Sequence, residues 1–139
     1  YEKCIKSCGD ILSHYDEDQL YPVFGFGFYF KDSNKKKLFN REYTSMNFPI
    51  NMNVENPDIN LIENISVEYR KFIRQIELSG PTHFSPIIKD LNNKVIEDVN
   101  KGNIRNYNIL LLLTDGEIGD ICVDTSSNKT YILSAIYHT

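Results

Sequence analysis

The stretch over residues 107–120 constrains the fold of this chain more than any other. Residues 109–113 form an unbroken apolar run that stops just before Asp115 and Gly116. A short apolar run without alternation predicts a strand buried on both faces of a sheet. In an open parallel sheet, ligands bind beyond the carboxyl ends of the strands, so Asp115 stands where a site is expected. An ordinary loop start gives the same Asp-Gly sequence, and both interpretations stay open on this stretch alone.

Length and composition favour one ordinary globular domain. The chain has 139 residues, of which 41% are hydrophobic and 24% charged. Its formal net charge of -4 argues against nucleic-acid binding driven by overall charge. No apolar run approaches the roughly 20 residues that span a membrane. The sequence contains three cysteines, Cys4, Cys8 and Cys122. Their odd number, and the lack of closely spaced metal-ligand partners, favour reduced thiols inside a cell.

The chain opens with an apolar pattern of helical period, which predicts an amphipathic helix. The pattern comprises Cys4, Ile5, Cys8, Ile11, Leu12 and Tyr15. Cys4 and Cys8 lie on one face of this helix. They could provide two of the ligands of a metal site, or they could be thiols packed in the core. The core interpretation is favoured because no second pair of ligands accompanies them.

An aromatic segment over residues 20–30 predicts a strand that contains Gly25 and Gly27. These glycines lack the rest of the phosphate-binding fingerprint, so we expect them to allow close packing under a helix. The polar residues 31–43 include three consecutive lysines and predict a solvated loop, with an anion site as the alternative. Alternation over residues 46–52 predicts a half-exposed strand, which Pro49 moves to a sheet edge.

Three further helices are predicted after this strand. Asn56 and Pro57 resemble an N-cap and first helical residue, and Gly80 and Pro81 are expected to end this helix, which carries apolar residues up to Ile76. A second begins at Ser85 and ends before Gly102, and a third follows residue 124 or 127 and carries residues 132–136. Helices that alternate with a buried strand predict an α/β layered fold.

Several stretches together resemble the copine-type von Willebrand factor A domain. They are the opening segments at residues 1–9 and 15–27, the edge strand at 48–51, the G-P-T-x-F-S-P-I-I loop at 80–88, and the L-L-L-T-D-G strand end at 111–116. These motifs occur in the family's order over nearly the whole chain. The resemblance implies a Rossmann-like von Willebrand factor A fold, with a mostly parallel sheet flanked by helices. Residues 1–139 would be a partial domain, apparently truncated at both ends and without the first and last strands.

The resemblance also implies a metal-ion-dependent adhesion site. Its ligands in this chain would be Thr82, from the G-P-T loop, and Asp115, from the D-G loop. Oxygen ligands of this kind suit Mg²⁺, with Mn²⁺ or Ca²⁺ as alternatives, and an open position would accept an acidic residue from a protein partner. The family's D-x-[ST]-x-S loop is absent from this sequence, so we expect the chain alone to bind metal poorly.

The functional expectation is therefore a protein-interaction module and not an enzyme. In copines this domain accompanies C2 domains, which implies a cytoplasmic protein with calcium-dependent recruitment to membrane phospholipid. The alternative is the related A domain of a RING-type E3 ubiquitin ligase. Phosphoryl transfer at Asp115 would need further acidic residues and a phosphate-positioning lysine near the strand ends, and no motif suggests them.

Overall fold

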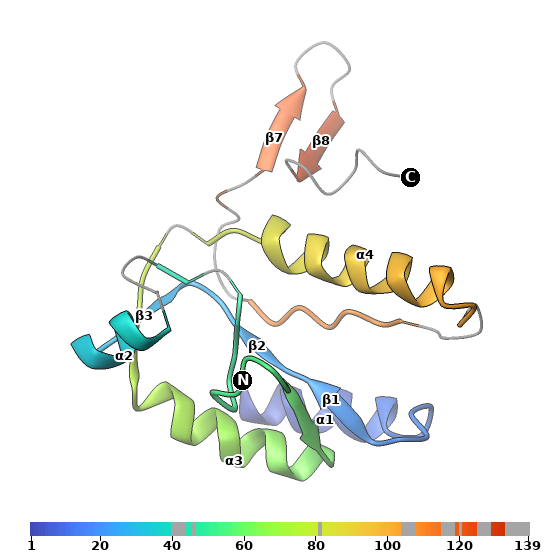
Figure 1. The fold of residues 1–139 in the computed structure, drawn as a ribbon, viewed down its shortest axis with the longest axis horizontal. Helices are drawn as coiled ribbons and strands as arrows, with labels where there is room; N and C mark the ends of the chain where they lie inside the picture. Colours follow the sequence, from blue (N-terminus) through green and yellow to red (C-terminus); the bar gives the residue numbers. More distant parts are fainter. Residues whose placement is uncertain are drawn as a thin grey trace. The chain divides into compact units, whose positions relative to one another are not determined.

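The computed structural model describes residues 1–39, 44–45, 47–80, 82–103, 108–114, 119, 121–124 and 129–132. These residues form a mixed α/β structure with helices and short strands (Figure 1). The chain divides into two compact units, Tyr1–Gly80 and Pro81–Thr139. All strand pairs in the described residues are antiparallel, so the predicted parallel sheet is not among them. No described helix is long and apolar enough to cross a membrane.

The first unit begins with the predicted helix, α1 (Glu2–Leu12), which packs on α3 (Ile62–Ile73). Gly9 is buried at this contact, and a β-carbon there would overlap the Ile62 side chain. Glycine therefore lets the two helices approach closely. Cys4 is exposed and Cys8 is half-buried, so the core interpretation is wrong for Cys4. The reason is that α1 turns Gly9, rather than Cys4, toward α3.

The predicted aromatic strand is divided into three short strands: β1 (Leu20–Pro22), β2 (Phe24–Gly25) and β3 (Phe28–Phe30). β2 and β3 are separated at Gly27, whose φ of 69° takes the backbone out of the extended region. Each piece pairs with a different strand: β1 with β5 (Asp58–Asn60), β2 with β4 (Phe48–Pro49) and β3 with β6 (Ile76–Leu78).

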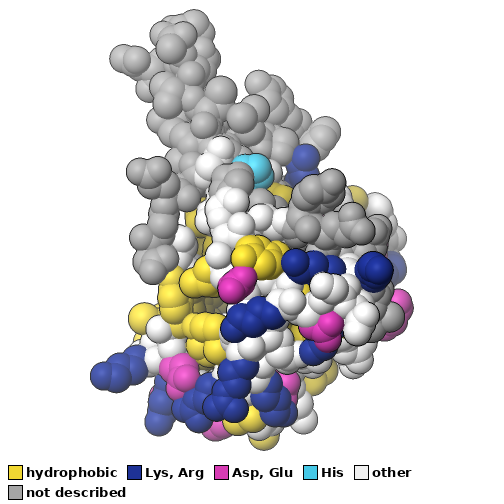
Figure 2. Space-filling view, turned by 90° about the vertical axis from the view of Figure 1, so that its left-hand side faces the viewer, with side chains coloured by type: hydrophobic (Ala, Val, Ile, Leu, Met, Phe, Trp, Pro, Cys, Tyr) yellow, Lys and Arg dark blue, Asp and Glu magenta, His cyan; other side chains and the backbone are white. Residues whose placement is uncertain are grey.

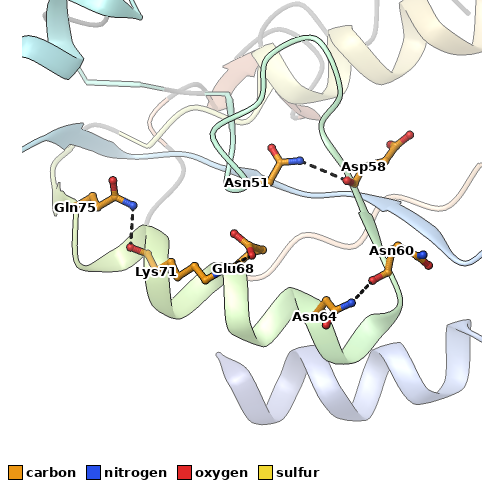
Figure 3. Close-up of polar contacts among 7 residues, drawn as sticks. All are labelled: Asn51, Asp58, Asn60, Asn64, Glu68, Lys71 and Gln75. Carbon is orange, nitrogen blue, oxygen red and sulfur yellow. Dashed lines mark hydrogen bonds and ion pairs between the residues drawn. The ribbon is translucent and has the colours of Figure 1, made fainter.

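Helix α3 is shorter than the sequence predicts at both ends. Asn56 and Pro57 do not begin it, because the next residues pair with β1 as strand β5. Ile76 lies in β6, where it is buried opposite Phe30. Side-chain amides shape the loop before the helix, with Asn51 Nδ2 3.4 Å from the Asp58 carbonyl oxygen (Figure 3). Asn64 Nδ2 donates to the Asn60 carbonyl at 2.7 Å and braces the start of the helix.

Phenylalanine rings form the core of the first unit. Phe28, Phe30 and Phe48 are almost completely buried, and the Phe28 ring meets those of Phe30 and Phe72 edge to face at 5.5 and 4.9 Å. Gly25 lies under α3 as predicted, since a β-carbon there would be 2.9 Å from Phe72 Cε1. The strand predicted in this segment is present as β4 and, among the described residues, pairs only with β2, but residues 48–50 are all buried, so the expectation that it is half-exposed is wrong. Phe48 joins the ring cluster, and the backbone turns after Pro49 instead of continuing to alternate.

The segment after β3 was predicted as a loop but contains α2 (Ser33–Leu38). The Asp32 carboxylate accepts the Asn34 N–H at 2.8 Å and caps the first turn of this helix. This N-cap therefore stabilises a helix in spite of the charge repulsion among its three consecutive lysines.

In the second unit, α4 (Ser85–Asn100) follows the prediction closely, and Gly102, with φ 85°, lies just beyond its end. The predicted buried strand is wrong: residues 108–114 have no strand assignment, and Ile109 and Leu111 are 58% and 45% exposed. Among the described residues no strand pairs with this run, and only Leu112 and Leu113 of its apolar residues are half-buried.

The last predicted helix is also wrong where the structure describes it. β7 (Ile121–Asp124) and β8 (Lys129–Ile132) form an antiparallel pair instead. Four ladder positions join the two strands, from Ile121 opposite Ile132 to Asp124 opposite Lys129. β-branched and aromatic residues within these strands favour the extended conformation over a helix. Leu133 and Ile136, which the predicted helix included, lie outside the described residues.

Candidate functional site

The candidate site of the second unit begins at Thr82, in the loop that leads into α4. Phe84 is 3% exposed and stands at the N-cap position of this helix, so the loop is anchored by a buried ring. Pro86 occupies the first turn, where a missing N–H costs nothing and the fixed φ suits the helix. Phe84 and Pro86 thus fix the helical end of the loop that carries Thr82.

The Thr82 backbone is joined to the turn that follows Asp115. The Gly119 N–H donates to the Thr82 carbonyl oxygen at 2.6 Å. This bond ties the G-P-T loop, which carries Thr82, to Gly119, four residues after Asp115 in the sequence. Asp115 itself lies outside the described residues, so its distance from Thr82 stays a prediction.

The Thr82 side chain is suited to an additional ligand. It is half-buried, and its hydroxyl has no hydrogen-bond partner among the described residues. A threonine hydroxyl and an aspartate carboxylate are hard oxygen donors, which Mg²⁺ prefers and usually supplements with several waters. Thr82 and Asp115 therefore fit such an ion by donor chemistry.

Other side chains do not assemble an alternative metal centre in the part of the chain that the structure describes. No group of three or more His, Cys, Asp or Glu residues there could hold a metal ion. Cys4 and Cys8, the alternative metal pair of the sequence analysis, are therefore not joined by a third described ligand. The metal site to test is therefore the one expected at the oxygen ligands Thr82 and Asp115.

Sequence reasoning missed the contribution of Gly119. Gly119 contacts Thr82 through its backbone N–H. Every residue except proline has this group, so no side-chain pattern identifies the contact. The sequence did place Gly119 within the D-G segment, and the structure adds its bond to Thr82.

Comparison with protein families supports the resemblance on which these residues were chosen. The family model described as Copine matches residues 1–138. The match includes α1, the aromatic strands, the G-P-T loop and the D-G segment, and so covers both units. The chain therefore belongs to the copine family.

Proposed function

We propose that this chain is the protein-interaction A domain of a copine-like, calcium-dependent phospholipid-binding protein. It would recruit partners through a metal-ion-dependent adhesion site that uses Thr82 and Asp115. The observation that supports the proposal is the Gly119 N–H to Thr82 carbonyl bond of 2.6 Å, since it ties the Thr82 loop of a copine-family chain to a residue four positions after Asp115.

The role of each residue follows from its chemistry. The Thr82 hydroxyl oxygen and the Asp115 carboxylate would hold Mg²⁺, or Mn²⁺ or Ca²⁺ in its place, and waters would complete the coordination. A bound divalent ion supplies an open coordination position that attracts a carboxylate. The protein partner would accordingly present an acidic residue. We propose that this arrangement serves binding rather than catalysis, since a reaction would need an acid and a base positioned beside the ion.

The finer fold that we propose is the Rossmann-like von Willebrand factor A domain. Its support is the apolar run at residues 109–113, whose first three residues are exposed and which Thr114 and Asp115 follow in the sequence. Pairing this run within a sheet would cover its apolar side chains and hold Asp115 at a strand end.

The proposed location is cytoplasmic, with calcium-dependent recruitment to membranes through C2 domains. The alternative, an A domain of a copine-related RING-type E3 ubiquitin ligase, would use the same site for substrate capture. A RING-type cluster of cysteines and histidines in the same polypeptide would favour the ligase, and two C2 domains would favour the copine.

Paramagnetic Mn²⁺ provides the test, because it reveals weak as well as tight binding. In the wild-type chain, we expect Mn²⁺ to broaden the NMR signals of Thr82 and Gly119 before those of the phenylalanine core. Thr82→Val and Asp115→Asn should remove the broadening, because each deletes an oxygen ligand or its charge while keeping the side-chain shape.

Thr82→Ser is the matched control, since it keeps the hydroxyl and should keep the broadening. An unchanged response in Thr82→Val and Asp115→Asn would show that these residues are not the ligands. Absence of selective broadening in the wild-type chain would refute metal binding at this position.

A further inference from the structure

One face of the first unit carries a concentration of positive charge that the proposed metal site does not use. We call it the basic surface. It consists of Lys31 at the end of β3, the three lysines of α2 and the residue that follows α3: Lys31, Lys35, Lys36, Lys37 and Arg74. Figure 2 shows Lys and Arg side chains gathered on this side of the molecule.

The fold brings this surface together from two distant segments of the sequence. Pairing of β3 with β6 places Phe30 opposite Ile76, and the Lys31 N–H then donates to the Gln75 carbonyl at 3.0 Å. Lys31 Nζ lies 3.3 Å from the Arg74 carbonyl oxygen, and Lys35 Nζ donates to Gln75 Oε1. These contacts fasten the start of α2 to the turn between α3 and β6, so that Arg74 joins the lysines.

The charges of the basic surface are not neutralised by ion pairs in the described residues. Two neighbouring cations on α3 are paired, Arg70 with Glu2 at 2.6 Å and Lys71 with Glu68 at 2.7 Å. No member of the basic surface lies within ion-pair distance of a described carboxylate. Asp32 and Glu77 lie in the same segments, but the basic surface has an excess of positive charge without ion pairs to it in the described residues.

The two acidic residues of these segments are already engaged. Asp32 caps α2 through the Asn34 N–H, and Glu77 accepts a hydrogen bond from the Tyr29 hydroxyl. That bond raises the pKa of Tyr29, whose phenol is in any case neutral near pH 7. Lys36 Nζ lies 4.9 Å from the centre of the same ring, which holds this lysine beside the other cations.

We propose that the basic surface docks this unit onto an anionic phospholipid membrane, independently of divalent metal. Clusters of about four to eight Lys and Arg residues bind anionic lipid headgroups through their summed charge. Four of the five members are lysines, which act as flexible point charges and suit a fluid array of headgroups. The chain as a whole carries a net charge of -4, so attraction to such a membrane would also orient it.

The composition of the basic surface favours a lipid over a folded protein as its partner. Protein interfaces are depleted in lysine and enriched in arginine and aromatic residues. Paired recognition of carboxylates or phosphates also favours the planar fork of arginine, which occurs here only at Arg74. An acidic protein segment is therefore the competing partner, and the experiment separates it from the membrane.

The experiment is co-sedimentation of the full chain with phosphatidylcholine vesicles that contain or lack phosphatidylserine. EDTA is present throughout, so that binding through Ca²⁺ or through the proposed metal site is excluded. The test variant is Lys31→Gln, Lys37→Gln and Arg74→Gln together, because all three side chains are exposed. The matched control is Lys89→Gln, Lys94→Gln and Lys101→Gln, which changes the net charge equally in exposed positions on or just after α4.

The wild-type chain and the control should sediment with the phosphatidylserine vesicles and not with pure phosphatidylcholine. Each basic residue near such a surface contributes roughly five-fold to binding, so the test variant should bind on the order of 100-fold more weakly. Binding should also fall steeply as salt is added. Circular dichroism of the variant verifies that α2 and α3 remain folded.

Equal losses in the test variant and the control would overturn the proposal, because they would show a response to net charge alone. Failure of the wild-type chain to sediment with phosphatidylserine would overturn it as well. In that case, binding to soluble poly-glutamate, lost in the test variant, would assign the surface to an acidic protein segment. None of these results depends on Thr82 or Asp115.

Discussion

The two units of this copine-family chain differ in how far their main apolar segments are covered. In Tyr1–Gly80, aromatic side chains from separate strands and from α3 meet in one buried cluster, and Phe28 and Phe30 have no exposed surface. In Pro81–Thr139, the longest apolar run of the described residues lies open, with Ile109 58% exposed. Hydrophobicity alone therefore does not decide burial, because a residue becomes buried only when other elements cover it.

The difference also separates the sources of stability from the proposed sources of function. The first unit contains long-range antiparallel pairs, close ring contacts and an ion pair between two helices. The described part of the second unit contains a long helix, the Thr82–Gly119 connection and a hairpin. We expect substitutions in the first unit to act mainly on folding, and those at Thr82 to act on binding.

The largest expected effect comes from removing the central ring of the core. Phe28→Ala should lower the free energy of unfolding by about 3 to 5 kcal/mol, because it leaves a cavity among Phe30, Phe48 and Phe72. Leu110→Ala, in the exposed run, should change it by less than about 0.5 kcal/mol. Urea denaturation followed by circular dichroism measures both, and equal losses would remove the distinction between the two apolar regions.

A smaller effect is expected from adding a methyl group beneath α3. Gly25→Ala would place a β-carbon 2.9 Å from Phe72 Cε1 and 3.3 Å from Phe28 Cε1, so the rings must shift. We expect a loss of about 1 to 3 kcal/mol in the same denaturation experiment. Gly80→Ala is the control, since no atom lies within 4 Å of its β-carbon position. A loss at Gly80 as large as that at Gly25 would contradict the packing argument.

The compact first unit also contains a strained position that can be relieved. Leu61 has φ 65° and ψ 139°, a conformation that favours glycine, and its side chain is 46% exposed. Leu61→Gly should therefore stabilise the chain by roughly 1 kcal/mol. Leu61→Ala removes the same side chain but keeps the β-carbon strain, so thermal unfolding should distinguish the two. A gain in the alanine variant equal to that in the glycine variant would assign the effect to the exposed side chain.

The smallest effect concerns the ion pair between α1 and α3. The hydrogen bond from Arg70 lowers the pKa of Glu2 below its ordinary value of 4.5. A lowered pKa means that the folded state favours the carboxylate. The stabilisation is thus present above the ordinary pKa and is lost as the pH falls through the lower folded value. The difference in urea midpoint between wild type and Glu2→Gln should therefore shrink on acidification.

Glu97→Gln in α4 is the control for this measurement, since its contact to Lys101 is longer, at 3.6 Å, and lies within one helix. A constant difference between wild type and Glu2→Gln from neutral to strongly acidic pH would show that the bidentate pair contributes nothing.

Features that depend on local sequence were predicted more accurately than those that depend on distant partners. The N-terminal helix and the helix that begins at Ser85 follow from apolar spacing and from the proline in the first turn. The close packing at Gly25 was also anticipated. In contrast, Asp58–Asn60 and Ile76–Leu78 were assigned to one helix, because only their pairing with β1 and β3 makes them strands.

The candidate site shows the same limit. Thr82 was identified through its resemblance to a family loop, whereas the bond that ties it to the D-G segment comes from a backbone group with no sequence signature. The basic surface was visible only as three consecutive lysines. Arg74 joins them through the register of β3 and β6, which sequence spacing does not reveal.

The absence of a side chain at Gly9 has an evolutionary consequence. Because a β-carbon there would overlap Ile62, residues 9 and 62 share one fixed volume between α1 and α3. Related sequences can enlarge one position only by reducing the other. We therefore expect these two columns to covary across the family, with any alanine or serine at position 9 accompanied by valine or a smaller residue at position 62.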